Sequence, residues 1–266
     1  MSVMRSRIIP CLLAGLASGI SSAHGAAGAI ATDRPDFVES SNVVGSGRLQ
    51  VETSVLFERD RDGVGRTRTW STPTLLRIGA GDSVELRIET DGRAVTEYSG
   101  AGQVRSTRSG WSDASFGVKW HVTDGAGAQP SLGILLHADL DSGSTFLRGQ
   151  GVRPSARIVG EWELPGNVSL GLMPGMGIER NDGGTRYRYG ILGLVVGSEL
   201  GQGVRGFVEL AMPRIARVRD GGSQASLDLG AAWLLSDTLQ LDAMLAHGLN
   251  RRTPDLAFTL GLSFKR

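Results

Sequence analysis

Two histidines lie on the polar side of predicted β-strands, where a hydrolytic or metal site could be built. His121 and His137 alternate with apolar residues, and Asp139 follows His137 by two positions on the same strand face. A histidine beside a carboxylate can activate a serine nucleophile. No motif places a nucleophile beside either histidine, and the scattered carboxylates lack metal-ligand spacing. We therefore expect no catalytic residue, no metal site and no cofactor.

Charged residues recur on the same polar faces along the chain, and we predict that they line a lumen. Inward charges of both signs can pair with one another, whereas burying them unpaired would be prohibitive. Two interpretations stay open: a structural network that fills the lumen, or the lining of a pathway whose selectivity it sets. The predicted lumen-lining residues are Glu52, Arg77, Glu85, Arg87, Glu89, Lys119, His121, His137, Asp139, Arg157, Glu161 and Glu209.

The elements that would position these side chains are strands with one apolar face. In the last one, residues 254–265, five Leu and Phe residues alternate with small or polar residues. About twelve segments between residues 47 and 266 repeat this pattern, joined alternately by short turns and longer polar loops, as in outer-membrane proteins. We expect an all-β fold, an antiparallel transmembrane β-barrel of about 12 strands. Residues 91–110 read as a polar loop, and the facing of residues 186–200 stays open because both registers contain apolar residues.

The N-terminal part of the chain predicts export followed by an irregular segment. Residues 1–25 have the three parts of a cleaved signal peptide, and the only cysteine, Cys11, lies within them. Residues 26–46 form no regular pattern, and we predict a periplasmic or plug segment. Asp33, Arg34 and Asp36 could pair there with lumen charges. The formal net charge is only +1 and no run of Lys and Arg occurs, so nothing indicates nucleic-acid binding.

Four stretches of the sequence resemble a known family. They are Thr32-Asp33-Arg34-Pro35-Asp36, Gly47-Arg48-Leu49-Gln50-Val51-Glu52, Thr72-Pro73-Thr74-Leu75-Leu76-Arg77-Ile78-Gly79, and Gly110-Trp111-Ser112-Asp113-Ala114-Ser115-Phe116-Gly117-Val118-Lys119-Trp120. Together they resemble the family named for the MetA-pathway of phenol degradation. The resemblance implies an outer-membrane β-barrel of a Gram-negative bacterium that moves small, often apolar compounds.

From the residues and the resemblance together we predict a function without catalysis. The chain is expected to be a passive transport channel for small compounds, aromatic or hydrophobic ones by the resemblance. Its expected partners are the solute, outer-membrane lipids and the barrel-assembly machinery. Two alternatives stay open: an outer-membrane hydrolase that uses His121 or His137, and a structural or adhesive barrel whose residues 91–110 contact partners.

Overall fold

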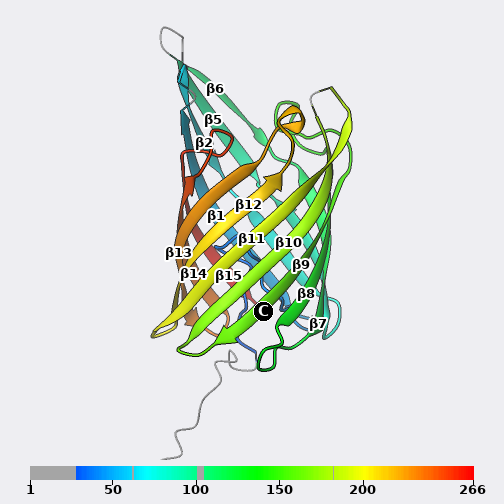
Figure 1. Cartoon of the computed structure of the whole chain (residues 1–266), viewed down its shortest axis with the longest axis vertical. Helices are drawn as coiled ribbons and strands as arrows, with labels where there is room; N and C mark the ends of the chain where they lie inside the picture. The colour runs from blue at the N-terminus through cyan, green and yellow to red at the C-terminus, as the bar shows by residue number, and fades with distance from the viewer. Residues whose placement is uncertain (1–27, 62, 101–104, 182) are drawn as a thin grey trace, which may run out of the picture.

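The chain folds as a closed antiparallel β-barrel (Figure 1). The computed structural model describes residues 28–61, 63–100, 105–181 and 183–266. The predicted signal peptide, residues 1–25, lies outside the described residues. The strands are β1 (Leu49–Arg61), β2 (Gly65–Ser71), β3 (Thr74–Gly79), β4 (Val84–Thr90), β5 (Arg93–Gly100), β6 (Ser106–Trp111), β7 (Ala114–Thr123), β8 (Ser131–Asp139), β9 (Arg153–Leu164), β10 (Val168–Arg180), β11 (Arg186–Gly201), β12 (Val204–Ile215), β13 (Gln224–Ser236), β14 (Leu239–Gly248) and β15 (Leu256–Lys265).

These segments make twelve strands around the barrel. Two-residue interruptions at residues 72–73, 91–92 and 112–113 divide three strands into β2 and β3, β4 and β5, and β6 and β7. At the first of these Pro73 has no N–H, so it cannot donate to a ladder. β1 pairs with β15, so the sheet has no free edge around its membrane-spanning part. The predicted 12-stranded barrel is confirmed.

The prediction of a loop at residues 91–110 is wrong. Residues 93–100 and 106–111 are β5 and β6, which extend the sheet beyond the rest of the barrel next to β2 (Figure 1). Thr, Val and Tyr favour extended backbone, and beyond the membrane a strand needs no continuous apolar face. The polar composition of residues 93–100 and 106–111 therefore reflects their position beyond the membrane, and not a loop structure.

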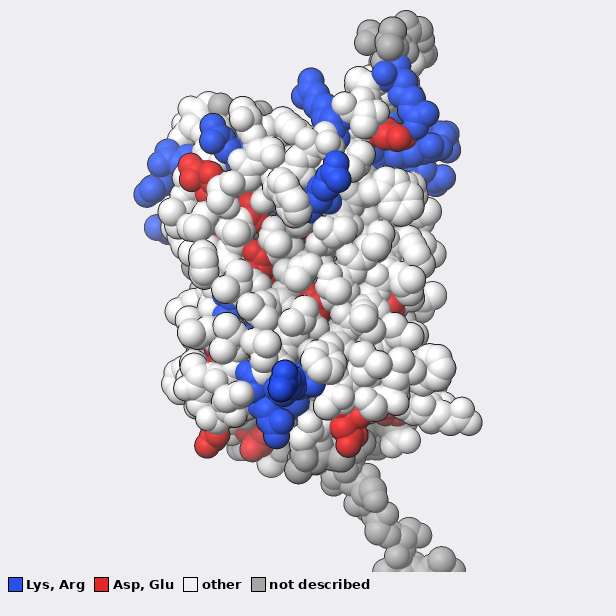
Figure 2. Space-filling view, turned by 180° about the vertical axis from the view of Figure 1, so that it is seen from behind, with Lys and Arg blue, Asp and Glu red and all other residues white. Residues whose placement is uncertain are grey.

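The outer surface of the barrel carries the apolar side chains. In β15, Leu260 is 56% exposed, whereas its neighbours Thr259 and Ser263 are buried inside. Figure 2 shows the result on one side of the barrel, a broad and largely uncharged band between two charged ends. This arrangement suits a bilayer, because the hydrocarbon accepts apolar side chains and the closed sheet pairs its backbone groups. The barrel therefore has the surface of a membrane-spanning β-barrel.

The structure determines the facing of β11, which the sequence left open. Leu194 and Val196 are exposed on the outside, whereas Ile191 and Val195 are buried on the inside. The inner wall is thus apolar at this strand. This apolar inner face packs against Val38 of the N-terminal part of the chain.

The two ends of the barrel differ in their connections. Two or three residues join β9 to β10, β11 to β12 and β13 to β14, whereas residues 140–152 and 216–223 are longer loops at the other end; η1 (Val218–Asp220) lies in the second of these. Short turns mark the periplasmic end of outer-membrane barrels. The chain enters there: the amide of Ile30 donates to the carbonyl of Asp237 in the β13–β14 turn, at 2.7 Å.

Among the helical residues that the structure describes, none forms a helix with the length and apolar character needed to cross a membrane.

A charge on the outer face of β15 should oppose insertion, and one on the inner face should not. Leu260→Arg should cost roughly 2–4 kcal/mol of folding free energy in lipid, because residue 260 faces the hydrocarbon. The matched change Gly261→Arg points inward, where an added Cβ would clash with Asp242 Oδ1, so the flexible Asp242 side chain must turn aside but can then pair with the new cation. The folding free energy of both variants is measured by denaturant titration in bilayers, with the heat-dependent gel shift of folded barrels as the readout. Equal losses at the two positions would contradict this facing.

Candidate functional site

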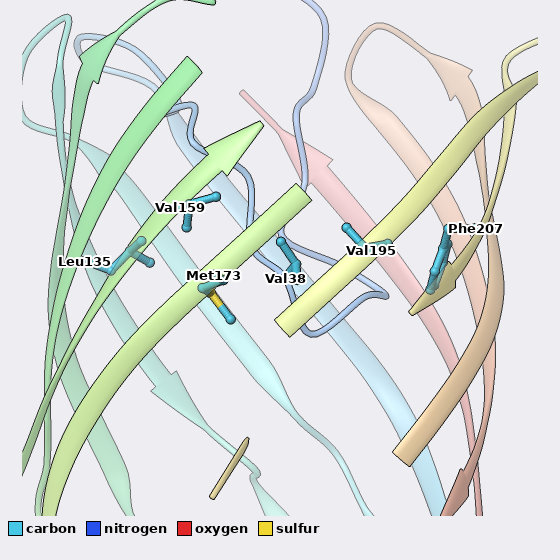
Figure 3. Packing of buried hydrophobic residues seen from close by; sticks show 6 residues of the cluster. All are labelled: Val38, Leu135, Val159, Met173, Val195 and Phe207. Carbon is cyan, nitrogen blue, oxygen red and sulfur yellow. The ribbon is translucent and has the colours of Figure 1, made fainter. Parts of the chain in front are cut away.

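The N-terminal segment, defined here as residues 28–46, lies inside the periplasmic half of the barrel (Figures 1 and 3). It has no helix or strand of its own. Its contacts reach β1, β3, β4, β7, β9, β12, β14 and β15, so it touches walls on opposite sides of the lumen. The lumen and this segment together form the candidate site.

The centre of the site is Asp33, surrounded by three cations of the wall. Its carboxylate accepts hydrogen bonds from Lys119 Nζ at 2.7 Å to both oxygens and from Arg87 Nη1 at 2.5 Å. Arg77 Nη1 lies 3.4 Å from Oδ2. Burial alone would raise the pKa of Asp33, but the charges of Arg77, Lys119 and Arg87 outweigh it and hold the pKa well below its usual value. Asp33 therefore stays ionised at neutral and mildly acidic pH.

The segment adds carboxylates to a cluster of buried wall charges. Arg77, Arg87 and Lys119 have fully buried side chains, as do the two carboxylates beside them, Glu52 and Glu85. Glu89 of the wall, which is partly exposed, lies 3.6 Å from Arg87, and the segment adds the carboxylates of Asp33 and Glu39. Removing one partner from such a group is strongly destabilising, because it leaves a buried charge without compensation.

A second carboxylate of the segment extends the network. Glu39 Oε2 lies 2.8 Å from Arg87 Nη2, and Oε1 lies 2.5 Å from Arg157 Nη1. Asp36 pairs with Arg205 at 3.0 Å, and Arg34 lies 3.6 Å from Asp242 and donates to Thr259 at 2.8 Å. Charged groups of the segment and the wall therefore alternate through the occupied part of the lumen.

Glutamates of the wall satisfy the backbone of the segment. Irregular backbone inside a protein must find partners for its N–H groups. Glu209 accepts from the amides of Phe37 and Val38, both at 2.7 Å. Glu52, Glu85 and Glu161 accept from the amides of Asp33, Val44 and Ser41. These inward carboxylates replace the strand neighbours that the segment lacks.

The facing part of the wall also contains an apolar strip, which lies among charged residues such as Arg157 and Glu209. Phe37 and Val38 of the segment pack against a strip of the wall. Figure 3 shows Val38 beside this strip. This apolar strip consists of Leu135, Val159, Met173, Val195 and Phe207. Gly193 lies beside it, and a Cβ there would come within 2.5 Å of Val38 Cγ2. The strip explains the two apolar registers of β11: one meets lipid and the other meets the segment.

Three of the predicted lumen residues lie outside the contact with the segment. His137 Nδ1 is 3.0 Å from Glu89 Oε2, and Asp139 lies nearer the extracellular end, 4.0 Å from Arg153. The other nine predicted lumen residues contact the segment. His121 does so through the backbone carbonyl of Ser41.

Sequence reasoning missed the part played by Phe37, Val38 and the apolar strip. The signal was present, because Leu135, Val159 and Met173 are large apolar residues on strand faces that are otherwise polar or small. Ser41 was also missed; its amide donates to Glu161 at 2.6 Å, and its hydroxyl contacts the same carboxylate. A polar residue in an irregular segment carries no sequence signal for such a contact.

Comparisons with known proteins agree with this architecture. Residues 32–265 match the model of the family described as MetA-pathway of phenol degradation. An outer membrane channel from Pseudomonas putida F1 superposes with a TM-score of 0.59 at 13% identity, covering 88% of this chain and 98% of that one. The β domain of the Bordetella autotransporter BrkA gives 0.56 at 13% identity, covering 82% and 99%. The translocator domain of the autotransporter NalP from Neisseria meningitidis gives 0.52 at 14%, covering 83% and 88%. No curated protein sequence matches the chain.

Removing the charge of Asp33 should loosen the segment much more than removing that of Asp36. Asp33→Asn removes the carboxylate that Arg77, Arg87 and Lys119 share, so docking should weaken by about 3–5 kcal/mol. Asp36→Asn breaks one pair with the partly exposed Arg205, which should cost about 1 kcal/mol or less. Hydrogen exchange at the amides of Val38 and Val44 measures both. Similar protection in the two variants would show that Asp33 is not the main anchor.

Bulk at Gly193 should expel the segment, and the same bulk at Gly190 should not. A Cβ at residue 193 meets Val38 and Phe37 at 2.5 and 3.1 Å, whereas the nearest atom to a Cβ at residue 190 is 3.5 Å away. Gly193→Val should make residues 28–46 accessible to protease in the folded barrel, with Gly190→Val unchanged. If both variants resist protease as the parent does, the segment can move aside without leaving.

Proposed function

The chain belongs to the MetA-pathway of phenol degradation family, and from that premise we propose that it is an outer-membrane channel through which small molecules pass without catalysis. Residues 47–266 form the barrel and residues 26–46 act as its plug in this proposal. The observation that carries it is a lumen filled by a separate segment of the chain rather than by side chains of the wall alone.

The plug can leave without opening the barrel. It precedes β1, and closure depends on the β1–β15 ladder, to which the plug contributes no strand. Most of its contacts are hydrogen bonds and ion pairs, which water and solute can replace in turn. Movement of a terminal segment against a fixed wall is a common form of gating.

The plug also indicates which solutes the lumen accepts. It presents carboxylates to Arg77, Arg87 and Lys119, and an aromatic ring with a valine to the apolar strip. A solute with the same two features can take the place of the plug on the same surfaces. We propose small aromatic carboxylates as the preferred class of solute. This class lies within the aromatic or hydrophobic compounds expected from the sequence and is narrower.

The histidines are assigned no catalytic step. Among the described residues, no hydroxyl or thiol is hydrogen-bonded to the ring of His121 or His137. His137 pairs with Glu89, so it lies in the part of the lumen above the plug and would line the pathway.

A disulfide between plug and wall tests the proposal directly. A Cβ at Gly171 would lie 4.0 Å from Val38 Cβ, within the usual range for a disulfide, although Val195 must move slightly. In liposomes, reduced Val38→Cys/Gly171→Cys protein should take up benzoate faster than the similarly sized benzylamine, because movement of the plug takes the carboxylates of Asp33 and Glu39 away from Arg77, Arg87 and Lys119. Oxidation should lower uptake to that of protein-free liposomes, and reduction should restore it.

Two single-cysteine variants are the controls, since they carry the same substitutions without the bond. A third variant, which lacks residues 29–44, should conduct continuously in planar bilayers. Uptake that persists in the oxidised protein would rule out movement of the plug as the gate. Absence of uptake in the reduced, folded protein for every solute would rule out the channel.

A further inference from the structure

Four arginines lie on the outer face where β1 and β2 extend beyond the membrane. Phe57 of β1 and Trp70 of β2 face outward, with ring centroids 4.5 Å apart. Side chains on one face recur every second residue, so Arg59 and Arg61 follow Phe57 on that face. Their partners on β2 by register are Arg68 and Arg66. We call Arg59, Arg61, Arg66 and Arg68 the outer arginine patch.

The patch places like charges directly opposite one another. Arg59 is paired in register with Arg68, and Arg61 with Arg66, an arrangement that destabilises a sheet. Among the described residues, the charges that act most on Arg66 are the three other arginines of the patch, and none of the four has an ion pair. Nearby Arg105, by contrast, contacts Glu97. Glu97 of β5 is paired in register with Arg68, but its carboxylate already contacts Arg105. The described chain therefore offers the four arginines one adjacent carboxylate, which offsets only part of their repulsion.

The height of the patch indicates what could offset it. Aromatic residues mark the interface of a bilayer, and each strand residue adds about 3.4 Å along a strand tilted by about 35–45°, so the patch lies about 5–11 Å above the Phe57–Trp70 pair. That is the level of lipid headgroups. Figure 2 shows Lys and Arg gathered on this extension, above the uncharged band.

The same arrangement recurs on another part of the barrel. Arg180 of β10 is paired in register with Arg186 of β11, and Arg188 is paired with Ile178, which faces outward. These arginines therefore also stand outside, at the extracellular end of their strands. A ligand distributed around the whole barrel fits this recurrence better than a single protein partner does.

We propose that the outer arginine patch binds the phosphate groups of lipopolysaccharide in the outer leaflet. Phosphate matches the planar guanidinium fork, and several phosphates on one headgroup can bridge arginines that repel one another. The adjoining rings of Phe57 and Trp70 contact the apolar part of the same lipid. A soluble polyanion would match the charge but leave these rings without a partner.

Binding of lipid A to the folded full chain tests the assignment. Native mass spectrometry in neutral detergent would count bound bisphosphorylated lipid A, with dephosphorylated lipid A as the matched probe. Arg61→Gln/Arg66→Gln should weaken binding of the phosphorylated lipid roughly tenfold or more, given the contribution expected from each arginine near an anionic headgroup. Arg61→Lys/Arg66→Lys should retain most of it.

The control removes two positive charges from the same end of the barrel without touching the patch. Arg108 belongs to the opposite face of β6, and Arg251 lies in the β14–β15 loop, so Arg108→Gln/Arg251→Gln should bind as the parent does. The gel shift confirms that each variant is folded before it is compared. Equal binding of both lipids by the parent, or equal losses in the patch variant and the control, would overturn the proposal.

Discussion

Closure of the sheet is the constraint on which the rest of this structure depends. Backbone groups find no partners in hydrocarbon, so the β1–β15 ladder must complete the barrel before any side chain can matter. Closure then divides every strand into an outer face that meets lipid and an inner face that meets whatever occupies the lumen. The outer requirement is uniform, and Leu, Val, Ile and aromatic residues satisfy it. The inner requirement differs from one wall to the other.

The inner faces serve a tethered occupant. On one side Arg77, Arg87 and Lys119 share the carboxylate of Asp33. On the other side the apolar strip packs against Phe37 and Val38. In such a lumen the same charged residues have both a structural and a functional role. The network that holds the plug is the surface that a solute would meet once the plug moves, so both interpretations of the inward charges describe the same residues in two states.

The outward arginines show a further consequence of the same geometry. A strand that continues past the membrane keeps its alternation, but its outer face now meets headgroups instead of hydrocarbon. On the outer faces of β1 and β2, the aromatic residues Phe57 and Trp70 therefore give way to arginines toward the extracellular end. Contacts at headgroup level would fix the height of the barrel in the membrane, while the closed sheet determines its diameter.

Local signals in the sequence were enough to predict the strands, their number and the facing of most of them, because period-two alternation and turn residues act over short distances along the chain. They also indicated that the lumen is charged and that residues 26–46 have no regular structure. What those charges contact depends on the closed barrel, which brings distant residues together. Asp33 and Lys119 are 86 residues apart, and Phe37 and Glu209 are 172 apart. The facing of β11 could not be read for the same reason: its inner register is apolar because of Phe37 and Val38, which reach it only after the barrel has closed around them.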